Sequence, residues 1–265
     1  MTKEGALTER TVHCEQHGDY EAAVGIFLGR EQISCCPACG QEREERRAQA
    51  EAEYFERQRR ERIAGNRKRA NLPERFAGST FENYIASTAG QQRALSVARA
   101  FAENFDAIRK TGSSLTFCGG PGCGKTHLAC AIANHLLNSE RKVIYTQAIE
   151  LVRAIRDTWR RDSSESETTV IGRYRSTGLL IVDEIGVQFG SEAERAQLFD
   201  VLDGRYREMR PSLIISNLSE KGLQECLGPR VFDRLMEIDS TMVLFNWGSH
   251  RRGQRCSRSA EAEAI

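Results

Sequence analysis

The sequence contains no apolar run that approaches the length needed to cross a membrane, and its start, Met1 to Gly5, lacks the apolar core of a signal peptide. It also carries almost no net charge, because 38 basic residues balance 37 acidic residues and leave a formal +1. The total charge therefore identifies no class of partner, and only the distribution of charge along the chain is informative. No internal repeat is visible. We expect a soluble, cytoplasmic protein whose 265 residues form one α/β core and a small additional module.

Cysteine, in contrast, is frequent. Four of the nine cysteines lie before residue 40, and the others are scattered through the expected core. This distribution is typical of a reduced compartment with one metal site. Two short pairs, Cys14-Glu15-Gln16-His17 and Cys36-Pro37-Ala38-Cys39, can together offer four ligands to a tetrahedral ion. We predict that residues 1–40 form a zinc-binding module in which Zn²⁺ is bound by Cys14, His17, Cys36 and Cys39.

This module is too small to fold by burying apolar surface alone, so a structural zinc would supply the missing stability. The segment 20–28 could form a small hairpin between the two pairs. His13 and Cys35 are neighbouring residues that could exchange into the site. The alternative interpretation is that the thiols are free in a disordered tail.

Residues 41–70 are predicted to form a charged helical linker. From Gln41 to Arg62 the sequence mixes Glu and Arg densely and offers little apolar surface, which favours a solvated helix. Its end, residues 57–69, is basic. Glu61 is the only acidic residue there, against the basic residues Arg57, Arg59, Arg60, Arg62, Arg67, Lys68 and Arg69. This stretch could neutralise the phosphates of single-stranded DNA, and a solvated linker explains the same charges equally well.

The remaining domain, 71–265, contains the pattern G-x-x-x-x-G-K-[ST] between an expected strand and an expected helix. Glycines allow successive backbone N–H groups to point at a polyphosphate, and the helix dipole adds positive charge. We predict a nucleotide site formed by Gly119, Gly120, Pro121, Gly122, Cys123, Gly124, Lys125, Thr126 and His127. Lys125 would reach the β- and γ-phosphates, and Thr126 would bind Mg²⁺. The alternative is a glycine-rich turn that binds nothing.

Two acidic residues follow a second apolar strand, at 179–184. Asp183 would hold Mg²⁺ through water, and Glu184 would polarise the water that attacks the γ-phosphate. Asn217, at the end of a strand at 212–217, could bond to the γ-phosphate or to that water. An ordinary surface turn and a plain strand cap are the respective alternatives.

Four apolar segments with strand character, at 113–118, 142–146, 179–184 and 212–217, alternate with segments of helical periodicity at 91–108, 147–160 and 192–209. Residues 162–169 are polar enough to form a loop. This alternation predicts an α/β fold with a parallel sheet and helices on both faces. Pro73 would end the linker helix, and aromatic residues at 76, 81 and 84 would anchor the following segment on the domain.

Arg230 and Arg234 lie four residues apart on one face of an expected helix, where pairing with Asp233 or Glu237, or simple solvation, would explain them. Taken together, several segments resemble the AAA+ ATPases of the DnaC/DnaI helicase-loader group, which are close relatives of the IstB transposition ATPases. They are the phosphate loop, the acidic strand end, Asn217, and the segments 72–76, 80–84, 230–234 and 244–247. The similarity covers about residues 71–250.

The resemblance implies an AAA+ ATPase that uses ATP and Mg²⁺, assembles into a ring or spiral, contacts a replicative DnaB-type helicase through its N-terminal region and places it on single-stranded DNA. Lys125, Thr126, Asp183, Glu184 and Asn217 match its Walker A, Walker B and sensor 1 positions. Arg234 best matches the arginine that acts on a neighbouring subunit, with Arg230 close by. Few residues follow Asn217, which leaves little room for a helical lid, and Arg251 and Arg252 are candidates for a second sensor by position alone.

Other functions remain open from the sequence. An IstB-like transposition ATPase would share the core and act on duplex DNA with a transposase. A small-molecule kinase would need an acceptor pocket, whereas Asp183 and Glu184 suit water activation. A zinc-bearing DNA-binding adaptor with a vestigial nucleotide site would be expected to lack at least one ATPase residue, and none is missing.

Overall fold

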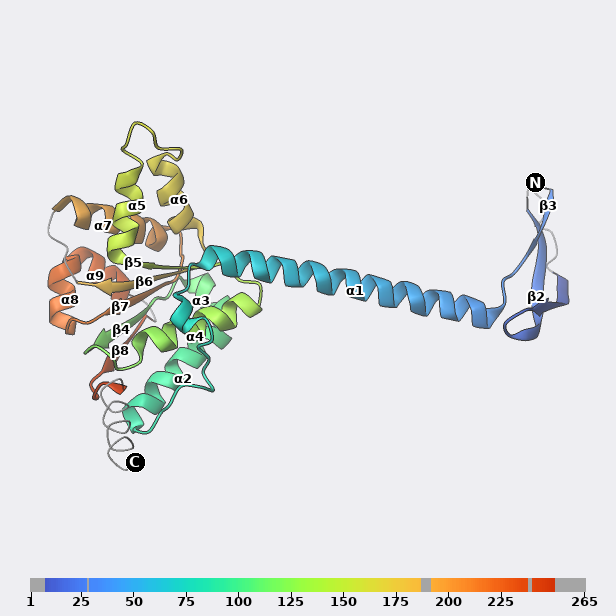
Figure 1. Cartoon of the computed structure of the whole chain (residues 1–265), viewed down its shortest axis with the longest axis horizontal. Helices are drawn as coiled ribbons and strands as arrows, with labels where there is room; N and C mark the ends of the chain where they lie inside the picture. The colour runs from blue at the N-terminus through green and yellow to red at the C-terminus, as the bar shows by residue number, and fades with distance from the viewer. Residues whose placement is uncertain (1–7, 28, 187–191, 238–239, 251–265) are drawn as a thin grey trace, which may run out of the picture. The chain divides into compact units, whose positions relative to one another are not determined.

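The computed structural model describes residues 8–27, 29–186, 192–237 and 240–250. The chain forms two compact units, Met1–Glu61 and Arg62–Ile265 (Figure 1). One continuous helix, α1 (Pro37–Ala70), belongs to both, because the boundary falls within it. Among the described residues, no helix combines the length and the apolar character that crossing a membrane requires.

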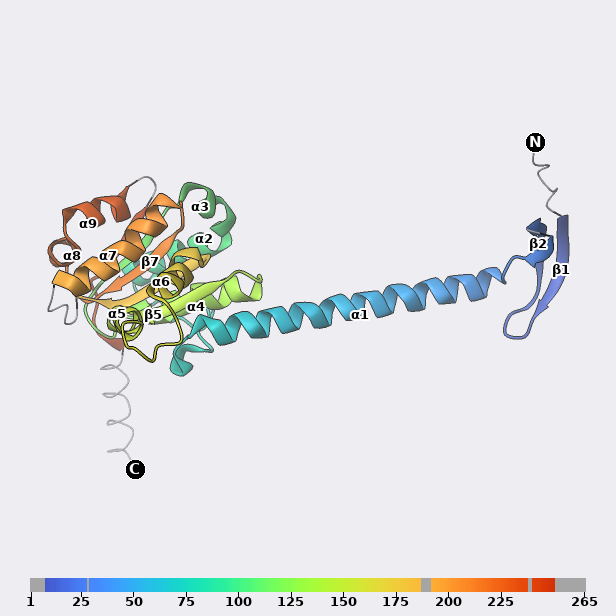
Figure 2. The same ribbon diagram turned by 90° about the horizontal axis from the view of Figure 1, so that it is seen from above.

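The first unit is built on a small antiparallel sheet of β1 (Thr8–Cys14), β2 (Gly18–Phe27) and β3 (Arg30–Ile33), in that order. Figure 1 labels β2 and β3, and Figure 2 labels β1 and β2. A tight turn joins β1 to β2, where Cys14 pairs with Gly18 and Gly18 adopts a φ of 79°. The expected hairpin at 20–28 is wrong: the described part of this segment is one straight strand. It does not turn, because its pairing partners come from the segments before and after it.

Helix α1 begins at Pro37, whose fixed φ suits the first helical position. Every residue from 41 to 57 is exposed, so this part of the helix buries nothing within its own unit. Within the second unit, Arg67 donates to the side chains of Asn134 and Asn138 at 3.1 and 2.8 Å. Arg62 forms an ion pair of 2.7 Å with Glu140. Part of the basic end of α1 is therefore used for packing.

The described residues of the second unit form a five-stranded parallel sheet. Its strands are β4 (Leu115–Gly119), β5 (Val143–Gln147), β6 (Leu179–Ile185), β7 (Ser212–Ser216) and β8 (Thr241–Phe245), in the order β5-β6-β7-β4-β8. Residues 179–182 of β6 are completely buried, as their unbroken apolar sequence predicts for a central strand. The parallel sheet is the predicted one, with β8 as an additional edge strand.

Helices cover both faces of this sheet, which confirms the predicted fold class (Figure 1). The core on one face includes α2 (Ala89–Glu103), α3 (Phe105–Thr111) and α4 (Lys125–Asn138). The core on the other face includes α5 (Ala148–Asp157), α6 (Glu167–Ser176), α7 (Glu192–Arg207), α8 (Glu220–Leu227) and α9 (Pro229–Met236). The 3₁₀ turn η1 (Glu74–Phe76) lies between α1 and α2.

Two local expectations are corrected. The helix expected over 91–108 is divided at Asn104, whose φ of −96° and ψ of 17° interrupt the helix and whose side-chain amide donates to the Ala100 carbonyl. The loop expected over 162–169 ends early, because α6 begins at Glu167. Ser166 caps this helix by accepting a hydrogen bond from the Thr169 N–H at 3.2 Å, so a polar residue starts a helix here.

A buried arginine fixes the amino ends of two central strands. Arg205, on α7, is completely buried and donates to the carbonyls of Tyr174, Thr177 and Pro211. It also donates to the Ser212 hydroxyl at 3.0 Å. Burial lowers its pKa to about 9, and the ring of carbonyl oxygens takes the place of a carboxylate partner. The turn before β6 and the start of β7 are thereby held together.

Candidate nucleotide site and metal centre

The phosphate loop connects β4 to α4 and depends on glycine at two positions. A side chain at Gly119, where φ is 144°, would place its Cβ 2.2 Å from the Phe245 carbonyl oxygen. At Gly124, where φ is 93°, a Cβ would lie 2.7 Å from the Tyr84 ring. The loop can therefore pass this closely to β8 and to the aromatic segment before α2 only because both positions lack a side chain.

Lys125 and Asn217 meet at the carboxyl edge of the sheet. Lys125 is 5% exposed, and its Nζ donates to the carbonyl oxygens of Gly119 and Gly120 at 2.6 and 2.7 Å. The same Nζ donates to Asn217 Oδ1 at 2.9 Å. The parallel strands β4 and β7 are neighbours, so the residues that follow them converge on this point. The ammonium is thus held where a polyphosphate on the loop would lie.

Asp183 lies beside Thr126 and is 5% exposed. Its Oδ2 accepts a hydrogen bond from Thr126 Oγ1 at 3.0 Å and another from the Tyr145 hydroxyl at 2.6 Å. Its Oδ1 accepts from the backbone N–H of Glu184 at 2.7 Å. A hydroxyl and a carboxylate side by side are the oxygen ligands that Mg²⁺ prefers, so these residues fit that ion. Burial and the charge of Asp183 raise the pKa of Tyr145, which keeps its phenol protonated.

Glu184 is exposed and occupies a strained backbone conformation. Its φ is 60°, a left-handed value that costs a non-glycine residue roughly 1–2 kcal/mol. The pairing of β6 with β7 shifts register between Val182 and Ile185, so the strand bulges at this residue. Bulges of this kind re-aim side chains near functional sites. Partial desolvation of its carboxyl group, and then the charge of Asp183, raise the pKa of Glu184, which suits a group that accepts a proton.

These residues border a cavity of about 400 Å³, large enough for a nucleotide. Most of the predicted site lines it: Pro121, Gly122, Cys123, Gly124, Lys125, Thr126, His127, Asp183, Glu184 and Asn217. Gly119 and Gly120 border a neighbouring hollow on the other side of Asn217. Residues of the segment before α2, one residue in the first turn of α2 and one residue after β8 complete the lining, namely Arg75, Phe76, Asn83, Tyr84, Ile85, Gln91 and His250.

No local motif assigns these additional lining residues to the site, although the aromatics at 76 and 84 were expected to anchor on this domain. The Tyr84 ring lies 5.6 Å from the His127 ring, and His127 Nε2 is 3.2 Å from the Thr80 carbonyl oxygen. On the other side, Cys123 Sγ donates to the Trp247 carbonyl at 2.9 Å. The Trp247 indole in return donates to the Cys123 carbonyl at 3.0 Å. The loop is therefore braced from both sides.

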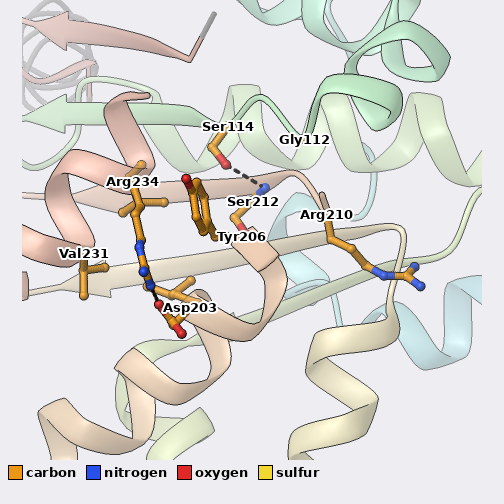
Figure 3. Close-up of a pocket in the computed structure, with 10 residues that line it drawn as sticks. Gly112, Ser114, Asp203, Tyr206, Arg210, Ser212, Val231 and Arg234 are labelled. Carbon is orange, nitrogen blue, oxygen red and sulfur yellow. Dashed lines mark hydrogen bonds and ion pairs between the residues drawn. The ribbon is translucent and has the colours of Figure 1, made fainter. Parts of the chain in front are cut away.

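The two predicted arginines are not brought to this cavity. Both are on α9, where Arg230 is exposed and lies over the Phe199 ring at 5.6 Å. Arg234 is 24% exposed, forms an ion pair with Asp203 of α7 and lies over the Tyr206 ring at 4.9 Å (Figure 3). Arg251 and Arg252, the candidates for a second sensor, lie outside the described residues.

Arg234 lies at the edge of the sheet opposite to the nucleotide cavity. The hollow around it is lined by Gly112 and Ser114, which precede β4, and by Ser212, which begins β7. Ser212 N donates to the Ser114 hydroxyl at 3.2 Å (Figure 3). This hydrogen bond connects the amino ends of β4 and β7. The phosphate loop and Asn217 follow the carboxyl ends of the same two strands, so Arg234 and the nucleotide cavity lie at opposite ends of β4 and β7.

In the first unit, the four predicted zinc ligands converge. The ligand atoms of Cys14, His17, Cys36 and Cys39 all lie within 4.8 Å of one another. Cys39 Sγ is 3.5 Å from Cys14 Sγ and 3.3 Å from His17 Nδ1. A tetrahedral Zn²⁺ with bonds of about 2.3 Å to sulfur separates its ligand atoms by similar distances. Three thiols and one imidazole at this spacing fit a structural zinc ion.

Hydrogen bonds within the cluster shift the pKa values of two of these thiols in opposite directions. The Gln16 backbone N–H, followed by the His17 ring, lowers the pKa of the Cys14 thiol to about 6, while the neighbouring Cys14 raises the pKa of Cys39 to about 11. Glu42, which the sequence analysis missed, accepts from His17 Nε2 at 2.9 Å and leaves Nδ1 facing the cluster. Carboxylates commonly orient zinc-binding histidines in this way. His13, a suggested spare ligand, instead bonds to Asp19 at 2.6 Å.

The sheet order, the phosphate loop and the acidic strand end define an ATP-binding protein of the AAA+ class. More specifically, the chain belongs to the family of IstB-like ATP binding proteins, whose family model matches residues 48–255. The replicative helicase loader DnaC of Escherichia coli (strain K12) is 38% identical over 172 residues, which cover 65% of this chain and 69% of that protein. DnaC of Buchnera aphidicola (subsp. Baizongia pistaciae) is 32% identical over 184 residues, with coverages of 69% and 74%.

Solved structures agree on the fold. The crystal structure of the DnaC helicase loader superposes with a TM-score of 0.58 at 23% identity, covering 65% of this chain and 99% of that one. The crystal structure of DnaI gives a TM-score of 0.58 at 20% identity, covering 68% and 95%. The predicted resemblance to the DnaC/DnaI group is confirmed.

Proposed function

We propose that this protein is an ATP-dependent loader that binds a replicative, DnaB-type helicase and places it on single-stranded DNA. The observation that supports the ATP-dependent part is the convergence of Lys125, Thr126, Asp183, Glu184 and Asn217 at one edge of the sheet. Similarity to replicative helicase loaders at 38% identity supports the choice of partner. No observation favours the transposition function, since these similar proteins are helicase loaders.

The geometry supports one role for each of these residues. Lys125 would exchange its carbonyl partners for the β- and γ-phosphates of ATP. Thr126 and Asp183 would hold Mg²⁺, which neutralises phosphate charge when bound. Glu184 would accept a proton from the attacking water, and Asn217 would bond to that water or to the γ-phosphate. The aromatic segment before α2 would cover the base.

We further propose that Arg234 completes the nucleotide site of a neighbouring subunit in a ring or spiral. It lies at the wrong edge of the sheet to reach the cavity of its own chain. Asp203, which is 4% exposed, holds it inward through their ion pair. Assembly would therefore have to release Arg234 from Asp203 before its charge could stabilise a transition state elsewhere.

Replacing Arg234 with alanine is expected to leave ATP binding intact and to reduce assembly-stimulated hydrolysis by about 10³-fold, the typical contribution of such an arginine. Phosphate release as a function of protein concentration measures this effect. Arg207→Ala is the matched control, because Arg207 Nη2 is the second partner of Asp203, at 2.6 Å, and is 63% exposed. Unchanged turnover in Arg234→Ala, or an equal loss in Arg207→Ala, would rule out the role in trans. If Arg230→Ala alone lost turnover, the role would pass to Arg230.

The zinc cluster and helix α1 are proposed to form the contacts with the helicase and with single-stranded DNA. Zn²⁺ would hold the small sheet of the first unit in shape for contact with the helicase. On α1, Arg62 and Arg67 already contact Glu140 and the Asn134–Asn138 pair. Contact with single-stranded DNA would therefore fall mainly to the other cations of the basic end, in particular Arg57, Arg60 and Lys68.

The proposed function is tested with the full chain, a purified DnaB-type helicase from the same source, and single- and double-stranded DNA. We expect the two proteins to elute together on gel filtration and the complex to prefer single strands. The measurement is repeated without nucleotide and with a non-hydrolysable ATP analogue. Failure to associate under both conditions would contradict the helicase assignment. ATP-dependent coating of duplex DNA would instead indicate a transposition ATPase.

A further inference from the structure

A tyrosine outside the predicted site contacts the acidic residue at its centre. Tyr145 lies on β5, next to β6, in a register that pairs Tyr145 with Ile181 and Gln147 with Asp183. Residues two apart on a strand share a face, so Tyr145 and Asp183 point to the same side of the sheet. The phenol crosses diagonally between the strands and donates to Asp183 Oδ2 at 2.6 Å. Tyr145 is 4% exposed, so its side chain is shielded from solvent.

The hydrogen bonds of Asp183 leave one favourable direction for a metal-bound water. An ionised carboxylate has about four acceptor positions, two on each oxygen. Thr126 and Tyr145 fill both positions on Oδ2, and the Glu184 N–H fills one on Oδ1. The remaining position is on Oδ1. With two donors fixed on Oδ2, the carboxylate cannot rotate to present a different oxygen.

We propose that Tyr145 is a positioning residue for magnesium binding, which locks the Asp183 carboxylate so that Oδ1 faces the metal's coordination sphere. The inference rests on the proposed function, since it concerns the same nucleotide site. Without the phenol, Thr126 alone among the described side chains would orient Oδ2. Thr126 is itself a proposed metal ligand, so the carboxylate would be oriented by a group that the metal must also hold.

The test is a titration of the full-length wild type and Tyr145→Phe variant with MgCl₂. Binding of a labelled, non-hydrolysable ATP analogue is measured at each Mg²⁺ concentration by its fluorescence anisotropy. The substitution removes one oxygen atom and keeps the buried ring. We expect the half-saturating Mg²⁺ concentration to rise about tenfold, as for other residues that orient metal ligands. Affinity for the same analogue in excess EDTA should match that of the wild type. A melting curve of each protein verifies that the fold is retained.

Tyr174→Phe is the matched control, since Tyr174 is another buried tyrosine of the same unit and does not line the nucleotide cavity. It should leave the magnesium titration unchanged. The inference is overturned if the Tyr145→Phe titration coincides with that of the wild type, if Tyr174→Phe shifts it equally, or if affinity falls equally with and without Mg²⁺. If the wild-type chain binds no analogue at any Mg²⁺ concentration, the proposed function fails as well.

Discussion

Substitution of Glu184 by glutamine is expected to lower the rate of ATP hydrolysis by about 10³-fold while ATP still binds. Glutamine keeps the size and the backbone demands of the residue at a φ of 60°, but its amide cannot take a proton from the attacking water. General-base catalysis by a positioned carboxylate commonly contributes 10²- to 10⁴-fold. Steady-state phosphate release measures the rate, and the anisotropy of a labelled ATP analogue measures binding.

Glu150→Gln is the matched control for this prediction. Glu150 is a nearby acidic residue whose charge helps to raise the pKa of Glu184. Its carboxylate accepts from the Gln147 N–H at the start of α5, and glutamine can make the same capping contact. We expect the Glu150 variant to hydrolyse ATP at nearly the wild-type rate. Full turnover in Glu184→Gln, or an equal loss in Glu150→Gln, would show that Glu184 is not the base.

Removal of the metal from the first unit is the second large effect that we expect. Among the described residues of that unit, the buried side chains are Ala22, Val24 and Cys36, which is far too little apolar surface to hold three strands together. A metal bound by the proposed ligands would therefore supply most of the folding free energy there. A strong chelator should unfold β1–β3, which is measured as loss of amide hydrogen-exchange protection over residues 8–33. The second unit, with its own core, should keep its protection and its ATP binding.

Two single substitutions make the metal prediction specific to the cluster. Cys39→Ser removes a proposed ligand and should abolish stoichiometric zinc binding, which elemental analysis of the wild type should find at one ion per chain. Cys35→Ser alters the adjacent, exposed thiol that lies outside the cluster and should have no effect. Retention of zinc by Cys39→Ser, or a folded and protected β1–β3 sheet after chelation, would remove the structural role of the metal.

The sequence was sufficient for those parts of the fold and site whose residues lie close together in the chain. The phosphate loop is one continuous pattern, and the apolar run 179–182 identifies a central strand because such a strand is buried on both faces. Alternation of strands and helices then predicted the parallel sheet, which is confirmed. Parallel neighbours also bring Asp183 and Asn217 to one edge without any knowledge of distances.

Contacts that depend on the packing of distant elements could not be predicted in this way. Tyr145 appeared only as part of an apolar strand, since nothing local indicates that its hydroxyl reaches Asp183 on the next strand. In the sequence, Glu42 cannot be distinguished from the other acidic residues of the charged helix, and only the fold shows its contact with His17. The sequence does not indicate the break at Asn104, because the apolar residues of 91–108 keep a helical spacing across it. Each of these depends on three-dimensional neighbours rather than on local pattern.

The placement of Arg234 at one edge of the sheet and of the nucleotide cavity at the other has a consequence for the kinetics of assembly. A contact between surfaces at opposite edges of the sheet is heterologous, so two subunits joined by it complete one such contact and not two. If Arg234 acts on a neighbouring subunit, one terminal subunit of an open spiral would donate an arginine and receive none, and the spiral would have one fewer completed site than it has subunits. Turnover per subunit would then rise with the length of the spiral and reach its maximum only on closure, which would make hydrolysis a measure of how far assembly has progressed.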